Sequence, residues 1–195
     1  MPQIGLRHPC VAPITAETSG SMPTYGAGRV VGTAVSADLQ WTKQDNNFYS
    51  DDHITENDNS VSKGTMRFGL AHLKLSDGPT LFGMTKTTGT SGSPDVYTET
   101  GAPAPYLGFG YIRVLRMNGD TIYRACLLIK TQFGLPNETG NTKGENITWQ
   151  NPTIEGTVFG VYIDSSGDAS FRQQAEFTTY AAAEAWLHSK LNITT

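Results

Sequence analysis

The sequence predicts a single, mainly β domain spanning residues 1–195, with one short helix in the middle of the chain and a C-terminal helix. Residues 169–177 alternate apolar and polar side chains with the period of two that is typical of a strand. Glycine (21 residues) and proline (10 residues) are frequent and mark turns between short segments. A chain of 195 residues is long enough to bury a core without metal or disulfide bonds.

The first third of the chain reads as an arm followed by short strands. Residues 1–27 carry four prolines and no sustained period, which predicts an extended N-terminal arm with at most a short strand at Ile4–Leu6. Residues 29–41 are rich in valine and threonine and predict one or two strands. Residues 48–55 predict a short strand that ends in an acidic loop at 56–60.

The middle of the chain predicts a strand, a helix start and a loop. The apolar face of residues 65–75 changes halfway, which indicates a β-bulge near 69–71. Residues 76–79, Ser-Asp-Gly-Pro, are typical of a helix start, and we expect a short helix through Phe82. Residues 84–105 have no period, so we expect a long flexible loop.

The last third contains the clearest local signals. Asn118-Gly119-Asp120 predicts a hairpin between strands at 111–117 and 121–133. A polar loop at 135–146 precedes a strand at 154–163. After the strand at 169–177, a helix over 180–191 is predicted. Its cap candidates and the members of its apolar stripe are Thr178, Thr179, Ala183, Trp186, Leu187 and Leu191.

Two predicted strands are apolar on both faces. In residues 121–133 and 157–163, apolar side chains occupy alternate and intervening positions. Such strands must be covered on both sides. The domain core can cover one face, and either a helix of the same chain or a neighbouring subunit can cover the other.

Charge and hydropathy exclude several classes of protein. The net charge is −4, and no cluster of lysine and arginine is present that could hold a phosphate backbone, which argues against tight nucleic-acid binding. Charged residues make up 16% of the chain, below the roughly 25% of an average domain. This indicates either a surface that is covered in the working state or one rich in threonine, asparagine and serine. We expect no signal peptide and no membrane-spanning segment.

No residue pattern selects a catalytic or metal site. Cys10 and Cys126 belong to no Cys-x-x-Cys pair; two free thiols are the preferred interpretation, and a disulfide remains open. The acidic residues of 51–58 match no calcium loop, so a solvated loop without metal is expected. No two of His8, His72 and His188 have the i, i+4 spacing of a zinc helix, and Gly-x-Ser-x-Gly is absent. We expect no cofactor and no enzymatic activity.

An ordered set of short segments resembles the major tail tube protein of bacteriophages with long, non-contractile tails. The resembling segments are Ile4-Gly-Leu6, Tyr49-Ser-Asp-Asp52 with Glu56, Gly64-Thr65, Gly108-Phe109-Gly110-Tyr111-Ile112-Arg113-Val114, Tyr123-Arg124-Ala125, Lys130 with Gln132-Phe133-Gly134-Leu135-Pro136, Lys143-Gly144-Glu145, Pro152-Thr-Ile154-Glu-Gly156 and Glu184-Ala-Trp186-Leu187. The resemblance covers essentially the whole chain, and residues 84–105 are the part least expected to match.

The resemblance implies a phage tail tube fold, namely a β-sandwich or half-barrel with a short flanking helix and a C-terminal helix. It also implies a virion protein that is made in the host cytoplasm and has no active site. Six copies would form a ring, and stacked rings would form a tube through which DNA passes without tight binding. Other tail proteins (tape measure, terminator and distal tail protein) would be partners. The residues expected to make assembly contacts are Ile4, Leu6, Ile14, Tyr25, Val96 and Tyr97. Those expected in an acidic lumen or at a ring edge are Asp51, Asp52 and Glu56.

Three alternatives remain. A tail terminator or neck protein would form single rings. A carbohydrate-binding β-sandwich would use Tyr97, Tyr106 and Trp149 as a platform for stacking sugars. A metal-dependent hydrolase would use the acidic residues of 51–58.

Overall fold

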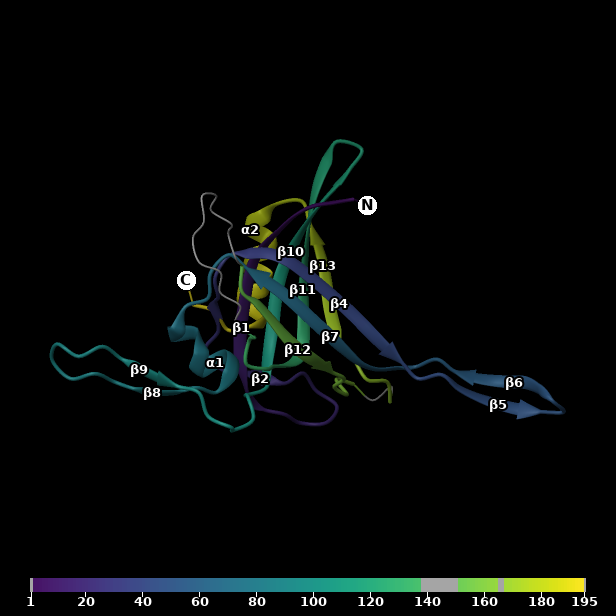
Figure 1. The fold of residues 1–195 in the computed structure, drawn as a ribbon. Helices are drawn as coiled ribbons and strands as arrows, with labels where there is room; N and C mark the ends of the chain where they lie inside the picture. The colour runs from purple at the N-terminus through teal and green to yellow at the C-terminus, as the bar shows by residue number, and fades with distance from the viewer. Residues whose placement is uncertain (1, 138–150, 165–166, 195) are drawn as a thin grey trace, which may run out of the picture.

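A curled antiparallel sheet of nine strands forms the body of the molecule, and two ribbons of two strands each project from it (Figure 1). The computed structural model describes residues 2–137, 151–164 and 167–194. The elements are β1 (Gln3–Ala16), β2 (Thr24–Tyr25), β3 (Arg29–Val30), β4 (Ala34–Lys43), β5 (Asn46–Ser50), β6 (His53–Asp58), β7 (Val61–Leu70), a 3₁₀ turn (Leu75–Asp77), α1 (Gly78–Phe82), β8 (Thr85–Thr87), β9 (Val96–Thr98), β10 (Leu107–Met117), β11 (Asp120–Phe133), β12 (Thr153–Phe159), β13 (Arg172–Phe177) and α2 (Tyr180–Lys190). The expected mainly β class with a short helix and a C-terminal helix is confirmed.

The predicted hairpin of β10 and β11 is confirmed, and its two strands lie at the centre of the sheet. Asn118 and Gly119 both adopt positive φ angles, 52° and 92°, which a two-residue turn of type I′ requires. The strand order is β2-β1-β10-β11-β12-β7-β4, with β3 added to β1 and β13 added to β11. The curl of the sheet brings β4 close to β1.

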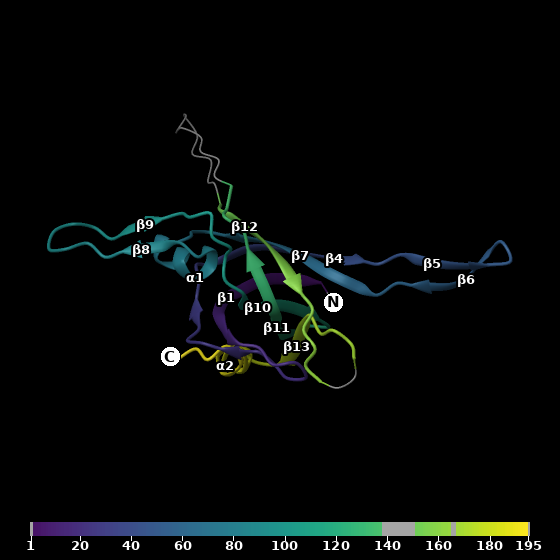
Figure 2. The ribbon, with the colours of Figure 1, turned by 90° about the horizontal axis from the view of Figure 1, so that it is seen from below.

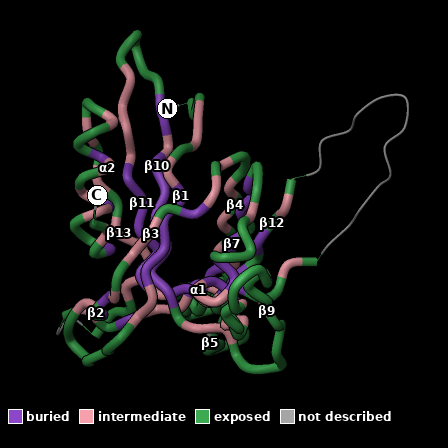
Figure 3. Tube along the Cα trace, turned by 90° about the vertical axis from the view of Figure 1, so that its left-hand side faces the viewer, coloured by how far each residue is buried: buried purple, intermediate pink, exposed green. Residues whose placement is uncertain are grey.

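The central strands are buried on both faces (Figure 3). One core lies inside the curl, where side chains of β7, β10, β11 and β12 meet α1; its largest members are Met66, Phe68, Phe109, Tyr111 and Phe133. The second core lies between α2 and the opposite face of β1, β10 and β11; it contains Cys10, Ala12, Ile112, Leu127 and Leu187. Figure 2 shows α2 lying against that face, away from α1. A helix of the same chain therefore covers the second face of β11.

Helix α2 begins and packs as the sequence predicts. The side chain of Thr179 accepts a hydrogen bond from the backbone N–H of Ala182 at 3.3 Å, which makes Thr179 the N-cap. The helix approaches the sheet closely because Gly108 and Gly110 of β10 have no side chain. A Cβ atom on Gly110 would lie 2.9 Å from Cδ2 of Leu187.

The expectation of a free N-terminal arm is wrong for most of its length. β1 is a central strand whose residues Cys10, Val11 and Ala12 are completely buried. Its ladder with β10 shifts register between Arg7 and Cys10, and Pro9 lies in that break, where no ladder hydrogen bond is lost. Pro9 is therefore compatible with a strand at this position.

Two segments form ribbons of two strands, where the sequence predicted one strand with a loop (residues 48–60) and one long loop (residues 84–105). β5 and β6 continue the β4–β7 hairpin outward, and the turn lies at Asp51–Asp52, so the predicted strand at 48–55 is divided and part of the loop at 56–60 is strand β6. Residues 84–105 contain the β8–β9 ribbon. Figures 1 and 2 show the two ribbons reaching out on opposite sides of the body. Both ribbons project away from the core of the molecule.

Three further predictions concern the bulge near residue 69, the polar loop at 135–146 and membrane-spanning segments. The expected bulge within the strand at 65–75 is wrong. The β4–β7 ladder is irregular beside Gly69 and Leu70, but the extra residue is Val35 on β4, and the apolar pattern changes because β7 ends at Leu70. Most of the predicted polar loop at 135–146 lies outside the described residues, as do Lys143-Gly144-Glu145 and Trp149. Among the described residues, no helix is long and apolar enough to cross a membrane.

Candidate assembly surfaces and side-chain clusters

The β5–β6 ribbon (residues 44–60) carries apolar side chains that its own chain does not cover. Tyr49 and Ile54 are directly opposite each other on the two strands and are 62% and 53% exposed. All residues of β6 are exposed. An isolated two-stranded ribbon is at best marginally stable in water. The tip of this ribbon is therefore a surface that would gain stability from a partner.

The β5–β6 ribbon is also strongly acidic. Between Gln44 and Ser60 the sequence has five carboxylates and neither lysine nor arginine. Asp51 and Asp52 form the turn, with φ angles of 51° and 61°, and Glu56 lies on β6. The three carboxylates belong to no group of three ligands that converge among the described residues. That they hold no metal stays a prediction.

The β8–β9 ribbon has a different character. Lys86 forms an ion pair with Asp95 at 2.7 Å, and its ammonium lies 5.9 Å from the ring centre of Tyr97. The side chain of Asp95 also accepts a hydrogen bond from the N–H of Gly89. Val96 is 54% exposed. This ribbon thus has its charges paired and an apolar residue open to solvent.

The residues expected to make assembly contacts divide into two groups. Ile4, Val96 and, in part, Tyr97 are accessible. Leu6 packs against the core inside the curl, and Ile14 packs against the core under α2. Tyr25 is buried and donates a hydrogen bond to the carbonyl of Ile129 at 2.8 Å. Leu6, Ile14 and Tyr25 are therefore intramolecular anchors, because β1 and β2 belong to the sheet.

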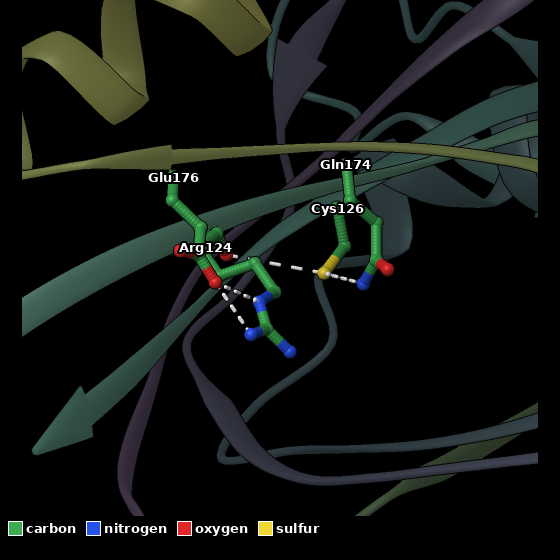
Figure 4. A network of polar contacts seen from close by, with 4 residues as sticks. All are labelled: Arg124, Cys126, Gln174 and Glu176. Atoms are coloured by element: carbon green, nitrogen blue, oxygen red, sulfur yellow. Dashed lines mark hydrogen bonds and ion pairs between the residues drawn. The ribbon is translucent and has the colours of Figure 1, made fainter. Parts of the chain in front are cut away.

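A polar strip joins β11 to β13 on the face that Figure 4 shows. Arg124 is directly opposite Glu176 and donates from Nε to its carboxylate at 2.9 Å. In the next pair on this face, the Nε2 of Gln174 donates to the Sγ of Cys126 at 3.2 Å. These cross-strand pairs fix the register of β13.

Both thiols are buried and unpaired. Cys10 lies in the core under α2 and Cys126 in the core inside the curl, so the two lie on opposite faces of the sheet. Burial raises the pKa of both thiols. Because the thiolate is the reactive form, neither cysteine has the character of a nucleophile.

A cluster of ionisable side chains, His8, Glu184 and His188, lies where β1 meets α2. The Nε2 atoms of the two histidines are 2.8 Å apart, and Glu184 Oε1 lies 3.3 Å from Nδ1 of His8. Burial lowers the pKa of His8, while the nearby Glu184 carboxylate opposes that shift. The spacing of the histidines in the sequence does not reveal this cluster. Its local signal is the i, i+4 spacing of Glu184 and His188 on the predicted C-terminal helix.

Neither the cavity nor the aromatic residues form a recognisable active site. A cavity of about 730 Å³ lies between residues 100–104 and strands β7, β11 and β12, and Glu155 is the one ionisable side chain among its described lining residues. Its carboxylate is ion-paired with Arg67 at 3.1 Å, and no second acid or base from the described lining residues accompanies it. Tyr106 packs against Phe159, with the Lys130 ammonium 4.3 Å from its ring centre, while Tyr97 lies on the β8–β9 ribbon. Trp149, the third residue of the suggested sugar platform, lies outside the described residues.

No family model matches the chain. A search of curated protein sequences likewise found no match.

Proposed function

We propose that this chain is a structural virion subunit that assembles with copies of itself into stacked hexameric rings, forming a phage tail tube through which DNA passes. The observation that carries the proposal is the pair of ribbons on opposite sides of the body, both with uncovered apolar side chains. Ribbons of this kind suit contacts between subunits, since burial of their apolar residues against a neighbour would stabilise them.

The edges of the sheet support the same proposal. Among the described strands, β4 pairs with β7 alone and β13 with β11 alone. An edge strand offers unpaired backbone donors and acceptors to which a neighbouring strand can add. Strand addition at such edges would join subunits laterally into a ring. The doubly buried strand β11 no longer argues for a neighbour, because α2 covers it.

The negative charge of the chain suits a tube through which DNA passes without binding tightly. The β5–β6 ribbon carries five carboxylates and the net charge of the chain is −4. DNA would be repelled from such a surface, whereas clustered lysine and arginine would retain it. The position of Asp51, Asp52 and Glu56 on the projecting ribbon favours a ring edge for them. The tape measure, terminator and distal tail proteins would be partners of the assembled tube.

Electron microscopy with negative stain tests the proposal. We expect the concentrated protein to form rings and tubes, and Y49S/I54S to abolish them while its circular dichroism stays that of the wild type. Leu75→Ser is the matched control, because Leu75 is 68% exposed but lies outside both ribbons. A wild-type protein that stays monomeric by light scattering at high concentration and under polymerising salt would refute the proposal. Single rings without stacks would identify a terminator or neck protein instead.

A further inference from the structure

Three side chains converge where the N-terminal strand meets the C-terminal helix. His8 comes from β1, and Glu184 and His188 lie one turn apart on α2. Suitable ligand atoms of the three residues lie within 4.8 Å of one another. The assembly proposal gives these residues no role, so the cluster needs a separate account.

The backbone aims His8 at the helix. His8 has a φ angle of 57°, in the left-handed region that few residues other than glycine adopt. It lies where the β1–β10 ladder changes register, between Arg7 and Cys10, and such irregularities turn a side chain to a new direction. The side chain of His8 is 7% exposed, so its ring is held in place.

The polar contacts place the ring of His8 between His188 on one side and Glu184 with Tyr180 on the other. Nε2 of His8 faces Nε2 of His188 at 2.8 Å. On its other side, Nδ1 of His8 lies 3.3 Å from the Glu184 carboxylate and 3.2 Å from the hydroxyl of Tyr180. A carboxylate that accepts the Nδ1–H of a histidine leaves Nε2 as the free acceptor, which is the usual arrangement around histidines that bind metal.

We propose that His8 and His188 bind one divalent transition-metal ion of the zinc type through their Nε2 atoms, with Glu184 positioning His8. Imidazole nitrogen suits zinc and its neighbours, whereas calcium and magnesium require oxygen ligands. Two bonds of roughly 2.0–2.1 Å at a tetrahedral angle place the nitrogens about 3.3 Å apart. The rings would therefore separate by about half an ångström. The proton that the two nitrogens share would leave to solvent and His188 would carry its proton on Nδ1, so that both rings bind as neutral imidazoles. Water would complete the coordination.

Such an ion would join the two ends of the chain. β1 and α2 contribute to the same core, and the ion would link them at its margin. A ligand that binds the folded state and not the unfolded state raises the temperature of unfolding. The site does not depend on assembly, so it can be tested whether or not the protein forms tubes.

Calorimetric titration of the chelator-treated full chain with zinc chloride tests the site. We expect one ion per chain and a rise in the unfolding temperature. His188→Ala should weaken zinc binding at least tenfold and remove the thermal shift. Glu184→Gln should weaken it by roughly 10–100-fold, the usual effect of losing a partner behind a metal-binding histidine. His72→Ala is the control, since His72 is exposed and outside the cluster, and it should bind as the wild type does.

Nuclear magnetic resonance of the wild-type protein gives a second readout that requires no variant. Zinc should shift the ring signals of His8 and His188 and leave those of His53 and His72 unchanged. The absence of binding with one-to-one stoichiometry, or binding that His188→Ala leaves intact, would overturn the proposal. So would shifts confined to His53 and His72.

Discussion

The close approach of α2 to β10 predicts the effect of adding one methyl group. A Cβ atom on Gly110 would lie 2.8 Å from Sγ of Cys10, 2.9 Å from Cδ2 of Leu187 and 3.0 Å from Cδ1 of Leu191. Carbon atoms in good contact lie about 3.5–4.0 Å apart, so all three neighbours must move. Overfilling a packed core in this way costs about 1–3 kcal/mol.

Gly110→Ala should be compared with Gly101→Ala. A Cβ atom on Gly101 would meet no atom within 4 Å, and both variants restrict the unfolded chain equally. The difference in the free energy of unfolding between them therefore isolates the packing cost. We expect Gly110→Ala to be less stable by about 1–3 kcal/mol in urea titrations, or roughly 2–12 °C in unfolding temperature for a chain of this size. In a Leu187→Ala background the cost should shrink, because one of the three contacts is gone. A difference below about 0.5 kcal/mol between the two glycine variants would refute this account of the packing.

Three further outcomes are expected. In the native protein at pH 8 neither Cys10 nor Cys126 should react with a thiol reagent, and both should react after unfolding; rapid native labelling would contradict their burial. Burial raises the pKa of Tyr111 to about 12. The folded state thus keeps a proton that the unfolded state loses above pH 10, and the stability present below pH 10 should fall by up to about 1.4 kcal/mol per pH unit as the pH rises toward 12. Tyr111→Phe should remove that part of the slope, and identical slopes would exclude it. Thr179→Ala should cost about 1 kcal/mol in urea titrations and Thr178→Ala should not, since Thr179 supplies the cap; equal losses would contradict this.

Local chemistry determined which elements the sequence could predict. The turn at Asn118–Gly119 and the cap at Thr179 depend on residues within a few positions of one another, and both are confirmed. The apolar stripe of α2 was also sufficient to identify its buried side, because Ala183 and Leu187 face the core. Such elements can be predicted because the residues that determine them are close together in the sequence.

Elements that depend on distant partners were harder to predict. β1 contains prolines and reads as an arm, yet it becomes a central strand because β10, about 100 residues later, supplies its ladder. The ribbons at β5–β6 and β8–β9 lack the regular alternation that a buried face imposes. The first therefore reads as one short strand and a loop, and the second reads as a loop. His8 and His188 are 180 residues apart in the sequence, so no local pattern could predict that they are in contact.

The difference between the two ribbons has a consequence for any filament built through them. One ribbon is a run of unpaired negative charge, and in the other Lys86 and Asp95 neutralise each other. Two acidic ribbons repel, so such a ribbon meets the opposite side of the next copy rather than its own kind. Contacts between unlike patches repeat in one direction only. The resulting filament has a head and a tail, and the proteins that start it and those that finish it must recognise different ends.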